Sequence, residues 1–252
     1  MIKIGIDVGS TTVKLVAIDE NDNLLFSKYE RHNAKAKETI LSFLKELLSE
    51  IGDKDISLRI TGSIGMGISE KCSLPFVQEV VAAAKAIQKD YSHVTSMIDI
   101  GGEDAKVVFF KDGEATDLRM NGNCAGGTGA FIDQMSIILG VNIDELNHLA
   151  MNAKQVYPIA SCCGVFCKTD IQNLIAKNVS RENIAASIFR AVAVQTVVTL
   201  AHGCDITTPV LFCGGPLTFI LALRKAFIDY LSFDEQEIIL PANGTLLPAL
   251  GA

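Results

Sequence analysis

The chain of 252 residues is apolar and acidic: 49% of its residues are hydrophobic, 20% are charged, and the formal net charge is −7 at pH 7. This apolar fraction excludes intrinsic disorder, because a chain of this length can bury a substantial core. The 22 basic residues are outnumbered by 29 acidic ones, which disfavours a nucleic-acid partner. The longest nearly apolar run, from Ala191 to Ala201, is too short to span a bilayer. We therefore expect a globular protein that binds neither nucleic acid nor membrane.

The first residues, from Met1 to Asp7, lead directly into a strand-like pattern, so no signal peptide is expected. Seven cysteines without an export signal favour a reducing cytoplasm over a disulfide framework. Three of them, Cys162, Cys163 and Cys167, lie within six positions. This excess of thiols requires another explanation.

Short apolar runs and turn residues predict a three-stranded antiparallel meander at the start of the chain. The expected strands are 2–8, 13–18 and 23–29, followed by a helix at 35–51, a strand at 57–61, a helix at 79–89 and a strand at 94–100. The second half is rich in helices. The expected helices are 126–139, 143–151, 164–177, 181–202 and 217–231, with strands at 209–213 and 237–240.

The opening pattern is repeated at the middle of the chain. Residues 6–16 align without a gap with residues 98–108, and an aspartate, a glycine and a lysine recur in register. Both copies read as a strand, a glycine-containing turn and a second strand. This duplication predicts an α/β fold of two similar lobes. Lobe I is expected over 1–93, together with about 236–252, and lobe II over 94–235.

Both glycine turns are suited to holding phosphate, because glycine permits close approach and successive N–H groups form an anion nest. The residues concerned are Asp7, Gly9, Ser10, Thr11 and Thr12 in the first copy and Asp99, Gly101, Gly102 and Asp104 in the second. An anion beside these carboxylates needs a cation, so we expect Mg²⁺ near Asp7 and Asp99, held largely through water. Asp7, Asp99 and Asp104 are the expected catalytic residues. One such motif alone could be an ordinary hairpin turn, whereas two could clamp a polyphosphate.

A lysine also recurs in both hairpins, as Lys14 and Lys106. A solvated lysine at a strand end and a phosphate contact are both open interpretations. The four histidines show no metal-binding spacing and are expected at the surface or in helix caps; they are His32, His93, His148 and His202.

A third strand–glycine element contains Gly214 and Gly215 and is compatible with a nucleoside lying on bare backbone. In this order, the three elements resemble the superfamily of actin, sugar kinases and heat-shock chaperone ATPases. The resemblance implies ATP and Mg²⁺ in a cleft between two ribonuclease-H-like lobes. Gly126, Gly127 and Thr128 are also expected at the nucleotide, with a helix cap as the alternative role for Thr128.

Two cysteines precede predicted helix N-termini, Cys124 and Cys163. Free N–H groups and the helix dipole favour thiolate there, and thiolates ligate iron–sulfur clusters. One chain is short of a full ligand set, whereas a two-fold homodimer would bring four thiolates to one [4Fe–4S] cluster. Buried structural thiols are the alternative. Cys72, Cys204 and Cys213 are expected in the core, and Cys162 and Cys167 are expected to play no part in the cluster site.

The segments around these cysteines closely resemble the activator ATPases of 2-hydroxyacyl-CoA dehydratases and benzoyl-CoA reductases. They read Asn-Gly-Asn-Cys-Ala-Gly-Gly-Thr-Gly-Ala-Phe-Ile-Asp at 121–133 and Ile-Ala-Ser-Cys-Cys-Gly-Val-Phe at 159–166. In that family a homodimer shares one bridging [4Fe–4S] cluster through two cysteines per subunit, the positions that Cys124 and Cys163 match. The resemblance covers essentially the whole chain. It implies that ATP hydrolysis drives a low-potential electron into a dehydratase or reductase, with flavodoxin or ferredoxin as reductant, in an anaerobic cytoplasm.

Pro216 to Phe219 look more like the N-terminal ATPase module of long fused activators than like the short ones. The sequence also stops at Ala252, where the family usually continues into a helix, so we expect a module of a longer polypeptide. The dehydratase component is thus expected either as a separate protein or fused to this module. Two other functions in the same superfamily stay open. One is a small-molecule kinase in which Asp104 or Asp133 deprotonates a hydroxyl, and the other is a non-catalytic nucleotide sensor.

Overall fold

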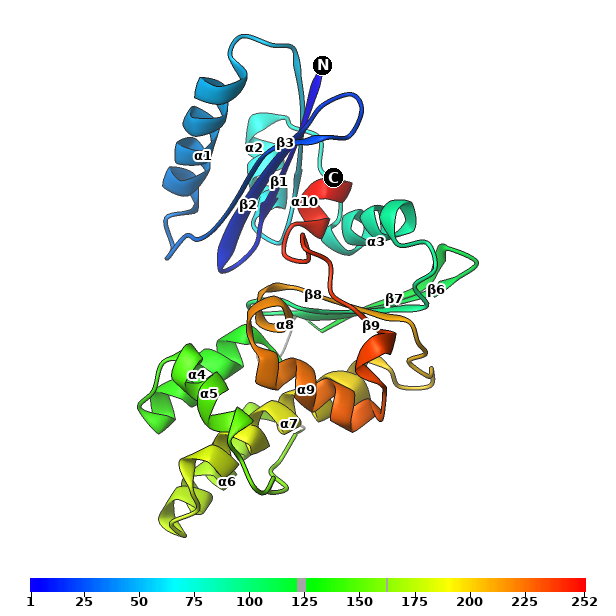
Figure 1. Ribbon diagram of the computed structural model, residues 1–252. Helices are drawn as coiled ribbons and strands as arrows, with labels where there is room; N and C mark the ends of the chain where they lie inside the picture. Colours follow the sequence, from blue (N-terminus) through cyan, green and yellow to red (C-terminus); the bar gives the residue numbers. More distant parts are fainter. Residues whose placement is uncertain (122–125, 162) are drawn as a thin grey trace. The chain divides into compact units, whose positions relative to one another are not determined.

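The computed structural model describes residues 1–121, 126–161 and 163–252. The chain forms two units, the first of residues 1–92 and 245–252 and the second of residues 93–244. Unit 1 and unit 2 are both α/β, and each contains its own sheet (Figure 1). The α/β class expected from the sequence is confirmed.

The sheet of unit 1 has the strand order β3-β2-β1-β4. Its strands are β1 (Ile2–Val8), β2 (Thr12–Ile18), β3 (Leu24–Arg31) and β4 (Ile56–Thr61). The first three form the predicted antiparallel meander, and β4 pairs in parallel with β1. Asp7, at the end of β1, lies opposite Lys14 of β2 and beside Thr61 of β4.

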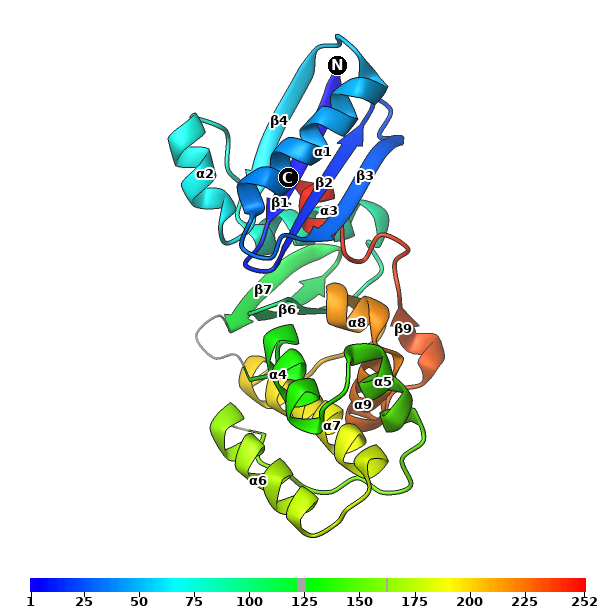
Figure 2. The ribbon, with the colours of Figure 1, turned by 90° about the vertical axis from the view of Figure 1, so that its left-hand side faces the viewer.

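Helices cover both faces of this sheet (Figure 2). They are α1 (Ala36–Ile51), α2 (Gly65–Cys72), α3 (Glu79–Asp90) and α10 (Leu247–Gly251). α1 buries Phe43 and Leu47, at i and i+4, in the core against β1 and β2. On the other face, α10 packs on β1, and a Cβ atom at Gly5 would overlap the carbonyl oxygen of Ala249. Glycine at position 5 therefore permits this close approach.

The sheet of unit 2 has the order β7-β6-β5-β8-β9. Its strands are β5 (Ser96–Ile100), β6 (Ala105–Lys111), β7 (Glu114–Asn121), β8 (Val210–Cys213) and β9 (Ile238–Ile239). β5, β6 and β7 are antiparallel, and β8 pairs in parallel with β5. The four strands β7-β6-β5-β8 thus repeat the order of the unit 1 sheet, in agreement with the duplication seen in the sequence.

Helices of unit 2 enclose a large core with this sheet. They are α4 (Gly129–Leu139), α5 (Ile143–Met151), α6 (Gly164–Ala176), α7 (Arg181–Leu200), α8 (Gly215–Phe219) and α9 (Leu221–Leu231), with a 3₁₀ turn at Glu235–Glu237. α7 packs against α5 and α9. It is long and apolar enough to cross a membrane, but 61% of its most apolar window is buried inside the protein. Such burial is typical of the core helix of a soluble protein.

Candidate functional site

The first predicted phosphate loop is a tight hairpin turn in unit 1. The N–H of Gly9 donates to the carbonyl of Thr12 at 3.0 Å, which closes the turn between β1 and β2. The Nζ atom of Lys14 lies 2.7 Å from Oδ2 of Asp7, whose side chain is fully buried. Ser10 and Thr11 lie at the tip of the turn with their hydroxyl oxygens 3.4 Å apart. Hydroxyl groups and backbone N–H groups at such a turn can contact phosphate oxygens.

The second predicted loop, in unit 2, repeats this geometry. The N–H of Gly101 donates to the carbonyl of Asp104 at 2.9 Å. Lys106 extends from β6 and donates to Oδ1 of Asp104 at 2.8 Å, and its Nζ atom lies 3.7 Å from Oδ2 of Asp99. Its side chain is only 1% exposed. The interpretation of Lys14 and Lys106 as solvated strand-end lysines is therefore wrong, because both pair with carboxylates inside their hairpins.

A glycine with positive φ follows the parallel strand in each unit and lies against the loop aspartate. In unit 1 this is Gly62, with φ 94°, where a Cβ atom would overlap Oδ1 of Asp7. In unit 2 it is Gly214, with φ 81°, where a Cβ atom would overlap Oδ1 of Asp99. Sequence reasoning selected Gly214 but missed Gly62. The signal was present, because Gly62 directly follows the strand beside β1, as Gly214 follows the strand beside β5.

The N-terminus of α4 contacts the second loop. The N–H groups of Gly129 and Ala130 donate to the carbonyls of Gly101 and Gly102, at 3.0 and 2.7 Å. A Cβ atom at Gly129 would also lie 3.2 Å from Cγ of Pro216. The second phosphate loop, the start of α4 and the residues after β8 thus converge within unit 2. Gly214 and Gly215, predicted at the nucleoside, belong to this group.

Gly126 and Gly127, which precede α4, pack against helix α7. A Cβ atom at Gly126 would overlap the side-chain amide of Gln195, and one at Gly127 would lie 3.2 Å from Oγ1 of Thr196. Thr128 is fully buried and is the N-cap residue of α4, without a side-chain capping bond. Gln195 was not selected from the sequence, although a glutamine inside an apolar helix is a signal for a buried polar contact.

His32 is a further residue that sequence reasoning misplaced. It is only 6% exposed, so the expectation of a surface or capping histidine is wrong. Its backbone N–H donates to the carbonyl of Thr11, and Nε2 lies 3.2 Å from the carbonyl oxygen of Gly9. Because a carbonyl only accepts hydrogen bonds, Nε2 is the protonated ring nitrogen in this contact. His32 therefore supports the first phosphate loop from the end of β3.

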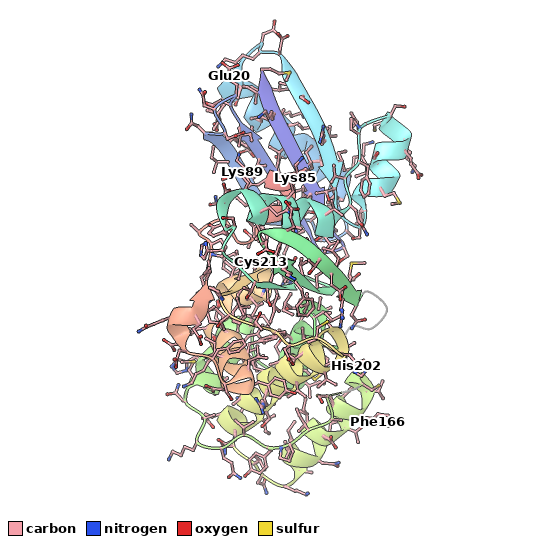
Figure 3. All side chains as sticks on the ribbon, turned by 90° about the vertical axis from the view of Figure 1, so that its right-hand side faces the viewer. Glu20, Lys85, Lys89, Phe166, His202 and Cys213 are labelled. Atoms are coloured by element: carbon pink, nitrogen blue, oxygen red, sulfur yellow. The ribbon has the colours of Figure 1, made fainter. Side chains whose placement is uncertain are left out.

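Of the two proposed cluster ligands, Cys163 is described by the structure and Cys124 lies outside the described residues, as does Cys162. Cys163 is the N-cap residue of α6, where helix N–H groups can stabilise negative charge. In the first turn of α6, Val165 is 71% exposed and Phe166 is 63% exposed. Figure 3 labels Phe166 on this helix. Within residues 1–121, 126–161 and 163–252, no group of three or more metal-binding side chains occurs. One chain therefore offers, within these ranges, no complete metal site.

The other described cysteines have different environments. Cys167 packs in the core of unit 2, and burial raises the pKa of its thiol to about 12. Cys213 is buried at the end of β8 (Figure 3). Cys204 accepts a hydrogen bond from the guanidinium of Arg119 at 2.9 Å. Cys72 is exposed, so its expected place in the core is wrong.

Mg²⁺ prefers carboxylate oxygens and retains much of its water, so the chemistry of the donor set fits this ion. The side chains of Asp7 and Asp99 are 0% and 6% exposed and lie beside lysines, so both carboxylates already have a cationic partner inside their hairpins. The Asp104 side chain is 21% exposed and is the most accessible of the three.

A family model of the BadF/BadG/BcrA/BcrD ATPases matches residues 4–252 of the chain. The chain belongs to this family. It is accordingly an ATPase, with the actin-like fold expected from its three glycine elements.

Two relatives in this family are dehydratase activators. The (R)-2-hydroxyglutaryl-CoA dehydratase activating ATPase of Acidaminococcus fermentans is 28% identical over 214 residues, which are 84% of this chain and 82% of that protein. The 2-hydroxyisocaproyl-CoA dehydratase activator of Clostridioides difficile is 29% identical over 266 residues, covering 100% and 93%. One of the subunits of benzoyl-CoA reductase from Thauera aromatica is 23% identical, over 94% of this chain and 85% of that protein.

Crystal structures of both activators match the fold along the whole chain. The A. fermentans protein gives a TM-score of 0.88 at 27% identity, covering 100% of this chain and 96% of that one. The C. difficile activator with bound ADPNP gives 0.86 at 27% identity, covering 100% and 92%. The family supports an ATP-dependent activator role for this chain.

Proposed function

We propose that this ATPase couples ATP hydrolysis to the delivery of a low-potential electron from a [4Fe–4S] cluster to a dehydratase or reductase of the 2-hydroxyacyl-CoA or benzoyl-CoA type. The cluster is shared by two copies of the chain, each contributing Cys124 and Cys163. When bound, it supplies the low-potential electron. We also infer that flavodoxin or ferredoxin supplies that electron, in an anaerobic cytoplasm.

The position of Cys163 is the observation that carries this proposal. The residue begins α6 next to the exposed side chains of Val165 and Phe166, so the proposed ligand lies beside an exposed apolar surface. Exposed apolar side chains of this size mark interaction surfaces when they gather in one place. Two thiolates per chain amount to half of a four-cysteine set, which a two-fold dimer completes.

The residues of the two hairpins bind the nucleotide in this proposal. In the first hairpin the hydroxyls of Ser10, Thr11 and Thr12 and the turn N–H groups would contact phosphate oxygens, and Asp7 would hold Mg²⁺ through water. In the second hairpin the turn N–H groups would contact phosphate oxygens, and Asp99 and Asp104 would hold Mg²⁺ through water. The nucleotide would reach backbone atoms without side-chain hindrance at four glycines, which are Gly101, Gly102, Gly214 and Gly215.

Binding energy can drive the activator only if ATP and ADP favour different conformations. The contacts of α4 with the second loop supply a path for such coupling, because Gly129 and Ala130 donate directly to Gly101 and Gly102. A change at this loop therefore acts on the start of α4, which follows Cys124 in the chain.

Anaerobic reconstitution with iron and sulfide tests the proposal. The wild-type chain should become a brown dimer with about four iron atoms per dimer. Cys163→Ala and Cys124→Ala should lose the iron, whereas Cys72→Ala, an exposed cysteine outside the site, should retain it. A colourless monomer that phosphorylates a polyol would contradict the proposal and favour the kinase alternative.

A further inference from the structure

Each phosphate-loop hairpin carries a lysine directly across the strand ladder from the aspartate that precedes the loop. Lys14 pairs with Asp7 in the register of β1 and β2, and Lys106 pairs with Asp99 in that of β5 and β6. The Lys14 side chain is 13% exposed and that of Lys106 is 1% exposed. The carboxylate that precedes each loop therefore already lies beside a positive charge.

We propose that Lys14 and Lys106 are positioning residues that make the binding of the divalent cation depend on the nucleotide. In the nucleotide-free protein the ammonium groups neutralise the loop carboxylates, so that Mg²⁺ alone is disfavoured. The ion binds together with ATP or ADP. This inference rests on the nucleotide site proposed above.

The charges of these groups explain why cation binding would depend on the nucleotide. A buried carboxylate is costly without a partner, and the lysine meets this need at a fixed place on the neighbouring strand. A free Mg²⁺ ion beside Asp104 would approach the Nζ atom that lies 2.8 Å from that carboxylate, and it would be repelled. The phosphates of a nucleotide bring negative charge and further oxygen ligands, which offset the repulsion.

The two hairpins differ in their balance of charge. Asp99, Glu103, Asp104 and Lys106 together carry two excess negative charges in the second hairpin. In the first hairpin Asp7 and Lys14 balance, and Thr12 stands at the position that aligns with Asp104. The cation therefore belongs mainly with the second loop, and Lys106 controls it more strongly than Lys14 does.

Binding of Mn²⁺, as a spectroscopic substitute for Mg²⁺, tests this inference on the full chain. The signal of free Mn²⁺ in electron paramagnetic resonance is followed with and without ADP. Wild-type protein should bind Mn²⁺ alone at least about tenfold more weakly than it does with ADP. Lys106→Met should bind Mn²⁺ alone at least about tenfold more tightly than the wild type, and Lys14→Met should show a smaller gain.

Lys111→Met is the matched control, because Lys111 is an exposed lysine on the same strand β6, and it should behave as the wild type. Lys106→Met/Asp104→Asn, which removes one charge of each sign, should return Mn²⁺ binding to the weak wild-type level. A lysine with a purely structural role would change stability in these variants without tightening Mn²⁺ binding.

Tight binding of Mn²⁺ alone to the wild type, equal to that with ADP, would overturn the inference, and this comparison needs no variant to fold. Unchanged Mn²⁺ binding in a folded Lys106→Met protein would overturn it as well. Failure of the nucleotide site itself looks different: the wild type would then not bind ADP with Mn²⁺, or Asp104→Asn would leave that binding unchanged.

Discussion

Gly62 places bare backbone directly against the carboxylate of Asp7. Its φ is 94°, and a Cβ atom there would overlap Oδ1 of Asp7 and lie 2.5 Å from the carbonyl oxygen of Val8. Gly214 has the same relationship to Asp99 in unit 2. The duplicated sequence therefore builds the same aspartate–glycine contact twice.

Gly62→Ala should lower the free energy of unfolding by about 3 kcal/mol or more, because a strained φ adds to an overlap with a fixed carboxylate. Gly140→Ala is the control, since Gly140 is a left-handed residue with φ 64° and ψ 41° and has no neighbouring atom within 4 Å of the added Cβ. The control should lose only about 1 kcal/mol from backbone strain. Denaturant unfolding measures both, and equal losses would refute the role of the contact.

Gly214→Ala should likewise be more damaging than Gly203→Ala in unit 2. Gly203 has φ 79° and open space around an added Cβ atom, whereas Gly214 faces Asp99 and the carbonyl of Ile100. Affinity for ADP, measured by titration calorimetry, should fall in a folded Gly214→Ala protein and stay unchanged in the control. The opposite order of effects would contradict this prediction.

Loss of the His32 contact should weaken nucleotide binding through the first loop. His32→Ala removes a hydrogen bond to Gly9, worth about 1 kcal/mol, so the KM for ATP should rise about fivefold. His32→Gln retains a side-chain N–H donor and should recover part of the loss. His148→Ala, on α5 in the other unit, is the control. An unchanged KM in His32→Ala would show that this histidine does not support the loop.

The buried thiol of Cys167 should lower the free energy of unfolding at alkaline pH. Burial raises the pKa of its thiol to about 12 in the folded protein, from 9.0 without burial, so the thiol form is favoured by folding. The folded state therefore loses stability as the pH rises from about 9, where the unfolded thiol ionises, toward about 12. Cys167→Val should make the free energy of unfolding depend less on pH in this range, and an unchanged slope would exclude the cysteine as its source.

In native protein, Cys72 should alkylate with iodoacetamide while Cys167 does not, because Cys72 is exposed and Cys167 is buried.

The exposed residues beside Cys163 should stabilise the proposed dimer. Phe166→Ser and Val165→Ser should shift reconstituted protein toward monomer in sedimentation velocity, at unchanged thermal stability of the monomer, because both side chains are exposed in one chain. Val198→Ser is the control, since Val198 is 57% exposed on α7 and away from α6 in sequence. A dimer that survives both changes on α6 would place the interface elsewhere.

The local elements and the duplicated hairpins could be predicted from the sequence because their signals are local. Apolar alternation marks β1 and β2, and the Asp-x-Gly pattern recurs without a gap, so the similarity of the two sheets follows from the repeat. The third glycine element could also be predicted, since Gly214 follows an apolar run.

Other features were missed. β7 follows a local hairpin signal, the Asp112-Gly113 turn with φ values of 55° and 81°, but its polar residues Glu114, Asp117 and Arg119 interrupt the apolar alternation expected of a strand. The short helices α2 and α10 were also missed. The expected helix at 217–231 is two helices, since Ile220 adopts an extended conformation, with φ −102° and ψ 98°. The burial of Lys106 could not be predicted, because a lysine is expected to be exposed to solvent unless its carboxylate partners are known.

Native mass spectrometry of the anaerobically reconstituted protein tests the central claim most directly, because it reads subunit number and metal content in one species. We predict two chains with a single set of about four iron and four sulfide ions, and apo monomer or metal-free dimer for Cys163→Ala. A wild-type species that carries a whole cluster on one chain, or a stable dimer that never takes up iron, would contradict the account.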